Sequence, residues 1–249
     1  MKHTSLIIAA TLVILAPVLA MSADTEVSDA ALVEHLAETS DTDARSELIY
    51  VLQERSSDQV RVALEAIASD KTEPGDLRMQ ALCGLAASAT SETVPLAIEI
   101  LKRDLADRTG LWACAIPLLG EIGDRRAAPI LYDIAALNEE HLVGMDHMAI
   151  RAISWMAVTK DAAFLETKAH ITPVRTDVMI ALARLGEISS LDILISGLLE
   201  GEEPKVIEAA SEGLMKIGEA ALPHLRDAIE TYPDEALRAR AQKLAEAIE

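Results

Sequence analysis

A short acidic segment contains the residue types best suited to metal chemistry. Glu139, His141, Asp146 and His147 fall within nine positions of one another, and imidazole and carboxylate groups are ligands for zinc and other divalent metals. The alternative is an acidic loop exposed to water. We expect no resident metal or cofactor, and these four residues are retained as weak candidates.

Two cysteines offer a second kind of chemistry. Cys83 and Cys114 are the only thiols in the sequence, and their spacing excludes a C-x-x-C redox or zinc motif. They fall on two helices that we expect to stack on each other, about one turn apart in height. In an exported protein they could form a disulfide. The alternative is a pair of small buried thiols.

Linear catalytic motifs are absent from the sequence. It contains no G-x-S-x-G elbow, no H-E-x-x-H, no P-loop and no G-x-G-x-x-G. We therefore assign no catalytic residue. Trp112 and Trp155 are the only tryptophans. If exposed they would suit partner binding, and if buried they would fill gaps between helices.

The N-terminus has the pattern of a secretory signal. Lys2 precedes an uncharged apolar run from Leu6 to Leu15, Pro17 breaks it, and Ala20 or Ala23 offers a small residue at a cleavage site. We predict a signal peptide over residues 1–23 and a periplasmic or secreted protein that spans no membrane after cleavage. The alternative is an uncleaved anchor, since the apolar stretch approaches spanning length.

The remainder of the chain repeats itself. Six large apolar residues, called anchors here, recur at intervals of 29 to 37 residues. In five of the six cases, the residue four positions before the anchor is alanine. Residues at i and i−4 share a helix face, so a small residue there lets a neighbouring helix approach closely. The anchors are Leu52, Leu85, Leu119, Met156, Leu185 and Leu214.

Each predicted anchor helix leads through a polar or glycine-containing turn into a second apolar helix. Residues 111–122 lead through Gly123 and Asp124 into 127–135, and residues 206–217 lead through Gly218 into 222–229. Residues 29–38 and 234–248 should form capping helices at the two ends. With 51% hydrophobic but only 2% aromatic residues, the core must be built from aliphatic side chains.

The repeat resembles a known family. Residues 119–131, LGEIGDRRAAPIL, look like the HEAT-like repeat of the phycobilisome-lyase type, and residues 185–188 and 216–223 resemble parts of the same unit. The resemblance covers about residues 43–249 and implies a right-handed α-solenoid. Together with the repeats and the end segments, it predicts an all-α fold of about six helical hairpins with capping helices, in a single domain over residues 24–249. It does not imply one activity, because such repeats serve unrelated roles.

Two enzyme types built from such repeats are disfavoured by the sequence. Di-iron deoxyhypusine hydroxylases use His-Glu pairs, and no histidine here is followed by glutamate. Phycobilin lyases act in the cytoplasm on a chromophore and a phycobiliprotein, whereas this chain has an export signal. We therefore expect an exported, non-catalytic scaffold for protein–protein interaction, with a lyase-type or metal-dependent enzyme as the alternative and a membrane-anchored adaptor as a third hypothesis.

The charge indicates the kind of partner. A formal net charge of −19 disfavours binding to nucleic acid. The predicted second helices, which usually line the concave face of such a stack, place carboxylates among apolar residues. We expect a protein partner, with a basic partner as the corollary. These carboxylates are Glu92, Glu99, Asp133, Glu166, Asp192 and Asp227.

Overall fold

The computed structural model describes residues 27–137 and 144–249, and within these ranges every regular element is a helix. The predicted signal peptide and the metal candidates Glu139 and His141 lie outside the described residues. None of the helices in the described ranges combines the length and apolar character that crossing a membrane requires.

The chain forms two compact units, whose boundary after Leu118 falls within one helix. Unit 1 ends at Leu118 and unit 2 runs from Leu119 to Glu249. The prediction of one repeat domain over residues 24–249 stays a prediction.

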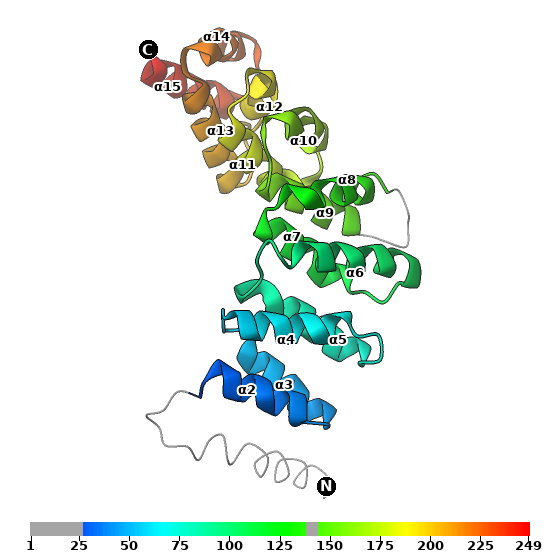
Figure 1. Ribbon diagram of the computed structural model, residues 1–249. Coiled ribbons are helices and arrows are strands. Elements are labelled where there is room, and N and C mark those ends of the chain that lie inside the picture. Colours follow the sequence, from blue (N-terminus) through cyan, green and yellow to red (C-terminus); the bar gives the residue numbers. More distant parts are fainter. Residues whose placement is uncertain (1–26, 138–143) are drawn as a thin grey trace, which may run out of the picture. The chain divides into compact units, whose positions relative to one another are not determined.

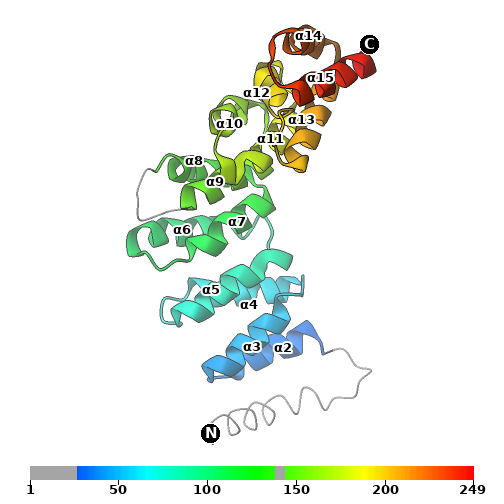
Figure 2. The same ribbon diagram turned by 180° about the vertical axis from the view of Figure 1, so that it is seen from behind.

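Unit 1 is a series of antiparallel helices that lie layer on layer (Figures 1 and 2). The predicted N-terminal capping helix is α2, and Ser28 caps it by accepting a hydrogen bond from the Ala31 N–H. The helices of this unit are α2 (Asp29–Glu38), α3 (Thr42–Leu52), α4 (Asp58–Ser69), α5 (Gly75–Gly84) with the 3-10 turn η1 (Leu85–Ala87), α6 (Val94–Asp107) and the first part of α7 (Trp112–Ile122).

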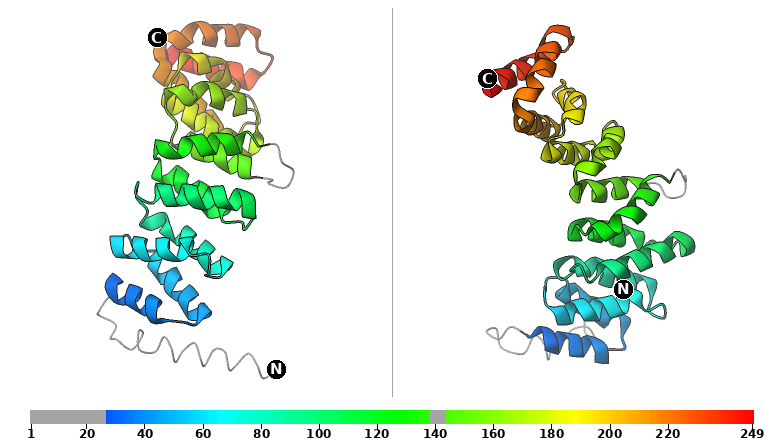
Figure 3. Two further views of the ribbon diagram at one scale, coloured as in Figure 1. Left: turned by 45° about the vertical axis from the view of Figure 1, so that its right-hand side comes forward. Right: turned by 45° about the horizontal axis from the view of Figure 1, so that its top comes forward.

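Unit 2 continues the same alternation and ends in the predicted C-terminal capping helix, α15, which lies beside α14 (Figures 2 and 3). A 3-10 turn precedes most of its second helices. The elements after α7 are η2 (Arg125–Ala127), α8 (Ala128–Ala135), α9 (Met145–Trp155), η4 (Thr159–Asp161), α10 (Ala162–Lys168), η5 (Thr172–Val174), α11 (Arg175–Leu185), η6 (Ile188–Ser190), α12 (Leu191–Ser196), α13 (Pro204–Ile217), η7 (Gly218–Ala221), α14 (Leu222–Thr231) and α15 (Glu235–Ile248).

The sequence pattern explains why these helices pack. The five alanines one turn before the anchors are buried, as are all the anchors except Leu185, which is half-buried beside the fully buried Leu182. A Cβ added at Gly120 would lie 2.9 Å from the Cα of Ala152, and one at Gly213 would lie 2.8 Å from the Cα of Ala183. Only glycine fits at such distances, so these two glycines set how closely the first helices of neighbouring hairpins approach. The predicted all-α fold of stacked helical hairpins is confirmed.

Candidate functional site

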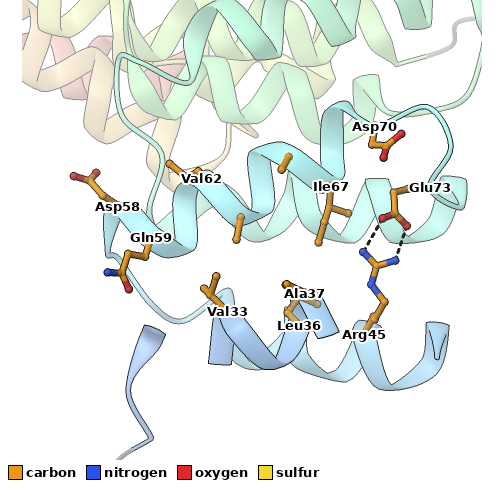
Figure 4. A pocket seen from close by; sticks show the side chains of 12 residues that line it. Val33, Leu36, Ala37, Arg45, Asp58, Gln59, Val62, Ile67, Asp70 and Glu73 are labelled. Carbon is orange, nitrogen blue, oxygen red and sulfur yellow. Dashed lines mark hydrogen bonds and ion pairs between the residues drawn. The ribbon is translucent and has the colours of Figure 1, made fainter. Parts of the chain in front are cut away.

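A groove in unit 1 lies between α2 and α4. Its volume is about 670 Å³. Figure 4 shows Val33, Leu36 and Ala37 of α2 facing α4 across it. It is lined by Val33, Leu36, Ala37, Arg45, Asp58, Gln59, Val62, Ala63, Ala66, Ile67, Asp70 and Glu73.

The groove exists because small side chains meet where large ones would close the gap. Ala37 on one wall and Ala63 and Ala66 on the other present only a methyl group each. The branched side chain of Val62 remains 56% exposed in the groove. An apolar ligand in the groove would remove this surface from water.

An ion pair closes one end of the groove. The Arg45 guanidinium donates to both carboxylate oxygens of Glu73, at 2.6 and 2.7 Å. This hydrogen-bonded partner raises the pKa of Arg45 above its ordinary value, although desolvation opposes the shift. A bidentate pair of this kind fixes both side chains, so this end of the groove is rigid.

A second cavity in unit 1, of about 150 Å³, lies beside the end of α6. Its wall includes Lys71, Arg78 and the buried Asp104. Asp104 accepts hydrogen bonds from the backbone N–H groups of Thr109, at 2.7 Å, and Trp112, at 2.8 Å. Asp104 thereby holds the loop that connects α6 to α7, and we assign it a structural role.

The two cysteines lie opposite each other in unit 1. Cys83 on α5 and Cys114 on α7 are joined as a disulfide, with their Cα atoms 5.1 Å apart, a separation that disulfides commonly span. The bond links the first helices of two adjacent hairpins, as the spacing of the cysteines suggested. It lies outside the lining of the groove.

The described metal candidates do not form a ligand set by themselves. His147 Nε2 lies 3.8 Å from Asp146 Oδ2, at the start of α9. Within the described residues there is no group of three or more metal-ligating side chains. A role for these two residues as ligands stays a prediction.

The two tryptophans lie at opposite ends of their helices. Trp112 begins α7 and is half-buried. Trp155 is 39% exposed, its indole N–H donates to Asp177 at 3.2 Å, and its ring lies against Gly120. This packing between hairpins is the alternative that the sequence left open for Trp155. A role of either residue in partner binding stays a prediction.

Sequence reasoning missed a buried polar cluster in unit 2. Asp161 is 1% exposed and accepts hydrogen bonds from Arg125 at 2.7 and 2.9 Å, from the Tyr132 hydroxyl at 2.5 Å and from the Val158 N–H at 2.9 Å. Burial alone would raise the pKa of Asp161, but these donors lower it below its ordinary value. Burial and the hydrogen bond to Asp161 raise the pKa of Tyr132 to about 12, which makes it a poor general base at neutral pH. The cluster joins two neighbouring hairpins through Asp161.

The fold is similar to solved structures of helical-repeat proteins. The complex of CpcE and CpcF of phycocyanin lyase from Nostoc sp. PCC7120 matches with a TM-score of 0.54 and 17% sequence identity, over 92% of this chain and 97% of that chain. Human deoxyhypusine hydroxylase, in complex with glycerol, aligns over 88% of this chain and 96% of that chain with 16% identity and a TM-score of 0.37. No protein-family model matches the sequence. No curated protein sequence matches it either.

The comparison corrects one expectation from the sequence. We expected a non-catalytic scaffold because linear catalytic motifs are absent, and that expectation is contradicted by the similarity to a phycocyanin lyase. The inference was wrong because a stack of helices can bring together residues from separate hairpins into a site that no contiguous motif reveals.

Proposed function

We propose that the protein has a lyase-type function, in which unit 1 binds an elongated, mostly apolar small molecule in the groove between α2 and α4 and presents it to an acceptor protein. One observation carries the proposal: a ligand-sized apolar groove occurs in a chain whose fold is similar to that of a phycocyanin lyase.

The dimensions of the groove support a small-molecule ligand. Its volume of about 670 Å³ falls within the roughly 300–1,000 Å³ typical of such sites. Its walls are mainly aliphatic and its polar side chains lie near the ends, an arrangement that binds the body of a ligand by desolvation and orients it through a few polar contacts.

A protein partner, here the acceptor, is proposed because the similar structure is a complex of two proteins. The net charge of −19 favours an acceptor with a basic surface, since complementary charge accelerates encounter. We also propose that the protein works in the periplasm or outside the cell. The signal-peptide pattern of residues 1–23 and the Cys83–Cys114 pair support this location, because disulfides persist in oxidising compartments.

Binding of a neutral apolar dye tests the groove. Nile red should bind the purified protein saturably with a blue-shifted emission, and Val62→Glu should weaken binding at least tenfold. Val51→Glu is the matched control, because Val51 is an exposed valine, 43% accessible, on α3 and outside the groove lining. Equal effects of the two substitutions, or no saturable binding, would refute a ligand site here.

Transfer of the bound small molecule to a second protein tests the lyase-type part of the proposal. Protein isolated from its own cells should carry a small molecule detectable by native mass spectrometry, and Val62→Glu protein should not. When the loaded protein is mixed with an extract of the same compartment, the small molecule should move to a second protein faster than it dissociates into buffer. Release at the same rate in extract and in buffer would contradict presentation to an acceptor.

A further inference from the structure

The charged groups that border the groove are occupied by partners within the protein, whereas one neutral polar side chain of its lining is not. That side chain is the amide of Gln59. We propose that the ligand is an uncharged amphiphile with a single hydrocarbon chain, and that Gln59 binds its hydrogen-bonding head. This inference rests on the proposed function, because it specifies the ligand of the same groove.

The ion pair at one end of the groove offers no site for a charged group. Arg45 donates to both carboxylate oxygens of Glu73, and the two charges cancel. The Nε of Arg45 has no hydrogen-bond partner in the described part of the chain, but it is shielded from solvent and therefore lies beyond the reach of a ligand. At this end the groove presents a closed ion pair beside the aliphatic side chains of Leu36 and Ile67 (Figure 4).

Asp70, at the same end, is bonded to its own loop. Its Oδ1 accepts hydrogen bonds from the N–H and the hydroxyl of Thr72, both at 2.8 Å. These two bonds lower the pKa of Asp70, and the nearby cations Arg78 and Arg45 lower it further. Because this carboxylate is already stabilised, it gains little from a cationic group on a ligand, and it would repel an anionic one.

The opposite end holds Gln59, which is the only uncharged polar residue among the described residues of the lining. Its neighbour Asp58 points away from α2 and lies 3.3 Å from Arg61 (Figure 4). The Gln59 side chain instead extends from the start of α4 on the side of Val33 (Figure 4). Its amide has no hydrogen-bond partner within the described residues, so both its donor and its acceptor are available to a ligand.

The cost of desolvation favours an uncharged head. A charged head that entered the groove would lose water and meet no unpaired opposite charge, which is costly. A neutral amide or hydroxyl head loses less, and it can replace its bound water with the Gln59 amide. The α4 wall beyond Gln59 is aliphatic and suits a hydrocarbon chain. This wall consists of Val62, Ala63, Ala66 and Ile67.

The length of this aliphatic wall sets the length of the chain. Gln59 and Ile67 stand eight positions apart on α4, which at about 1.5 Å per residue corresponds to roughly 12 Å along the helix axis. An extended hydrocarbon chain advances roughly 1.2 Å per bond, so about ten carbons span this distance. A chain of this length would cover the exposed surface of Val62.

Competition against Nile red with three molecules that share a chain of about ten carbons tests the charge of the head. Decanamide is neutral, whereas near neutral pH decylamine is cationic and decanoic acid is anionic. Decanamide should displace the dye at least tenfold more effectively than either charged molecule, because only its head avoids the burial of an unpaired charge.

Substitution of Gln59 tests whether this side chain binds the head. Gln59→Glu keeps the side-chain shape but removes the donor and adds a negative charge, so it should weaken decanamide about three- to tenfold and strengthen decylamine. Gln59→Leu should weaken decanamide to a similar extent without strengthening decylamine. Gln242→Glu is the matched control, since Gln242 is an exposed glutamine on α15 outside the groove lining.

The outcomes separate this inference from the proposed function. Equal displacement by the three molecules, stronger displacement by a charged one, or equal effects of the Gln59 and Gln242 substitutions would overturn the neutral head while leaving an apolar ligand site intact. Failure of Nile red to bind at all would instead refute the ligand site itself. A preference for decanamide that Gln59→Glu shifts toward decylamine would support the proposal.

Discussion

The first and last helices of the described chain, α2 and α15, both cap a helical unit, but different interactions hold them to the adjacent hairpins. α15 buries Leu237, Ala241 and Ala245, and Asp234 caps it while also accepting a hydrogen bond from the Glu200 N–H at 2.9 Å. Arg240 donates to the backbone oxygens of Leu198 and Leu199. This terminal helix is tied to the preceding hairpin by side chains as well as by packing.

Within the described residues, fewer side-chain interactions hold α2 than hold α15. The α2 helix buries two leucines, Leu32 and Leu36, and its ion pair between Asp29 and Arg55 spans 3.7 Å. Among the described residues, α2 makes fewer side-chain hydrogen bonds to the neighbouring hairpin than α15 does, and a helix held in this way opens at lower free-energy cost. The proposed ligand groove lies beside this more loosely held helix.

A pair of leucine substitutions tests this difference and should have the largest effect. Leu237→Ala should lower the free energy of unfolding by about 2–5 kcal/mol, because it leaves a cavity in a sealed interface. Leu36→Ala should cost less, near the lower end of about 2–5 kcal/mol, because its side chain borders an open groove and the site can relax. Urea denaturation followed by circular dichroism measures both. Equal losses would mean that the two ends are sealed alike.

The Cys83–Cys114 disulfide should make the largest single contribution to the stability of unit 1. Replacing Cys83 and Cys114 by serine should cost about 2–4 kcal/mol, because the bond closes a loop with a sequence separation of 31. Alkylation followed by mass spectrometry should find no reactive thiol in the native protein until reductant is added. Free thiols in protein isolated from its native compartment would contradict the pairing.

In unit 2, the Asp161 carboxylate links two hairpins by accepting hydrogen bonds from Arg125 and Tyr132. Asp161→Asn should lower stability at neutral pH by about 1.5–3 kcal/mol, the usual range for hydrogen bonds to a charged group. The folded-state pKa of Asp161 is depressed, so its contribution is present above the unfolded pKa of about 3.9 and is lost as the pH falls through the folded value.

The difference in stability between wild type and Asp161→Asn should therefore shrink below about pH 4. Asp133→Asn is the control, because Asp133 is exposed on α8 of the same unit. A difference that stays constant down to pH 2 would show that the carboxylate charge is not what stabilises the cluster.

The glycines test how closely the helices of unit 2 approach, with the smallest expected effect. Gly120→Ala should cost about 1–3 kcal/mol, because the new methyl group would overlap Ala152 and Trp155. Gly75→Ala is the matched control, since a Cβ there meets nothing within 4 Å. Thermal unfolding should separate the two variants. The same melting temperature for both would contradict the close approach.

Much of the fold could be predicted from the sequence because it depends on local signals. The alanines before the anchors, the glycine and aspartate turns and the charged, alanine-rich end segments act within one or two helical turns, and they predicted the hairpins and both capping helices. The C-terminal capping segment was predicted as residues 234–248, and α15 begins one residue later.

The groove could not be predicted in the same way. It depends on Ala37 and Ala66, which lie far apart in sequence, and on the absence of a large side chain between them. Alanine in a helix normally indicates that another helix packs closely against it. These alanines therefore predict close packing, whereas the structure has a groove there. The Asp161 cluster was missed for a related reason, since its partners Arg125 and Tyr132 belong to the preceding hairpin and no fixed spacing relates them.

Hydrogen exchange of the free and ligand-saturated protein tests the central claim most directly. Without ligand, the backbone amides of α2 should exchange faster than those of α15. With Nile red at saturation, the amides of α2 and α4 should become protected at least tenfold while those of α14 and α15 remain unchanged. Equal exchange at the two ends in the free protein, together with protection elsewhere or nowhere on binding, would contradict a ligand site at the loosely fastened N-terminal helix.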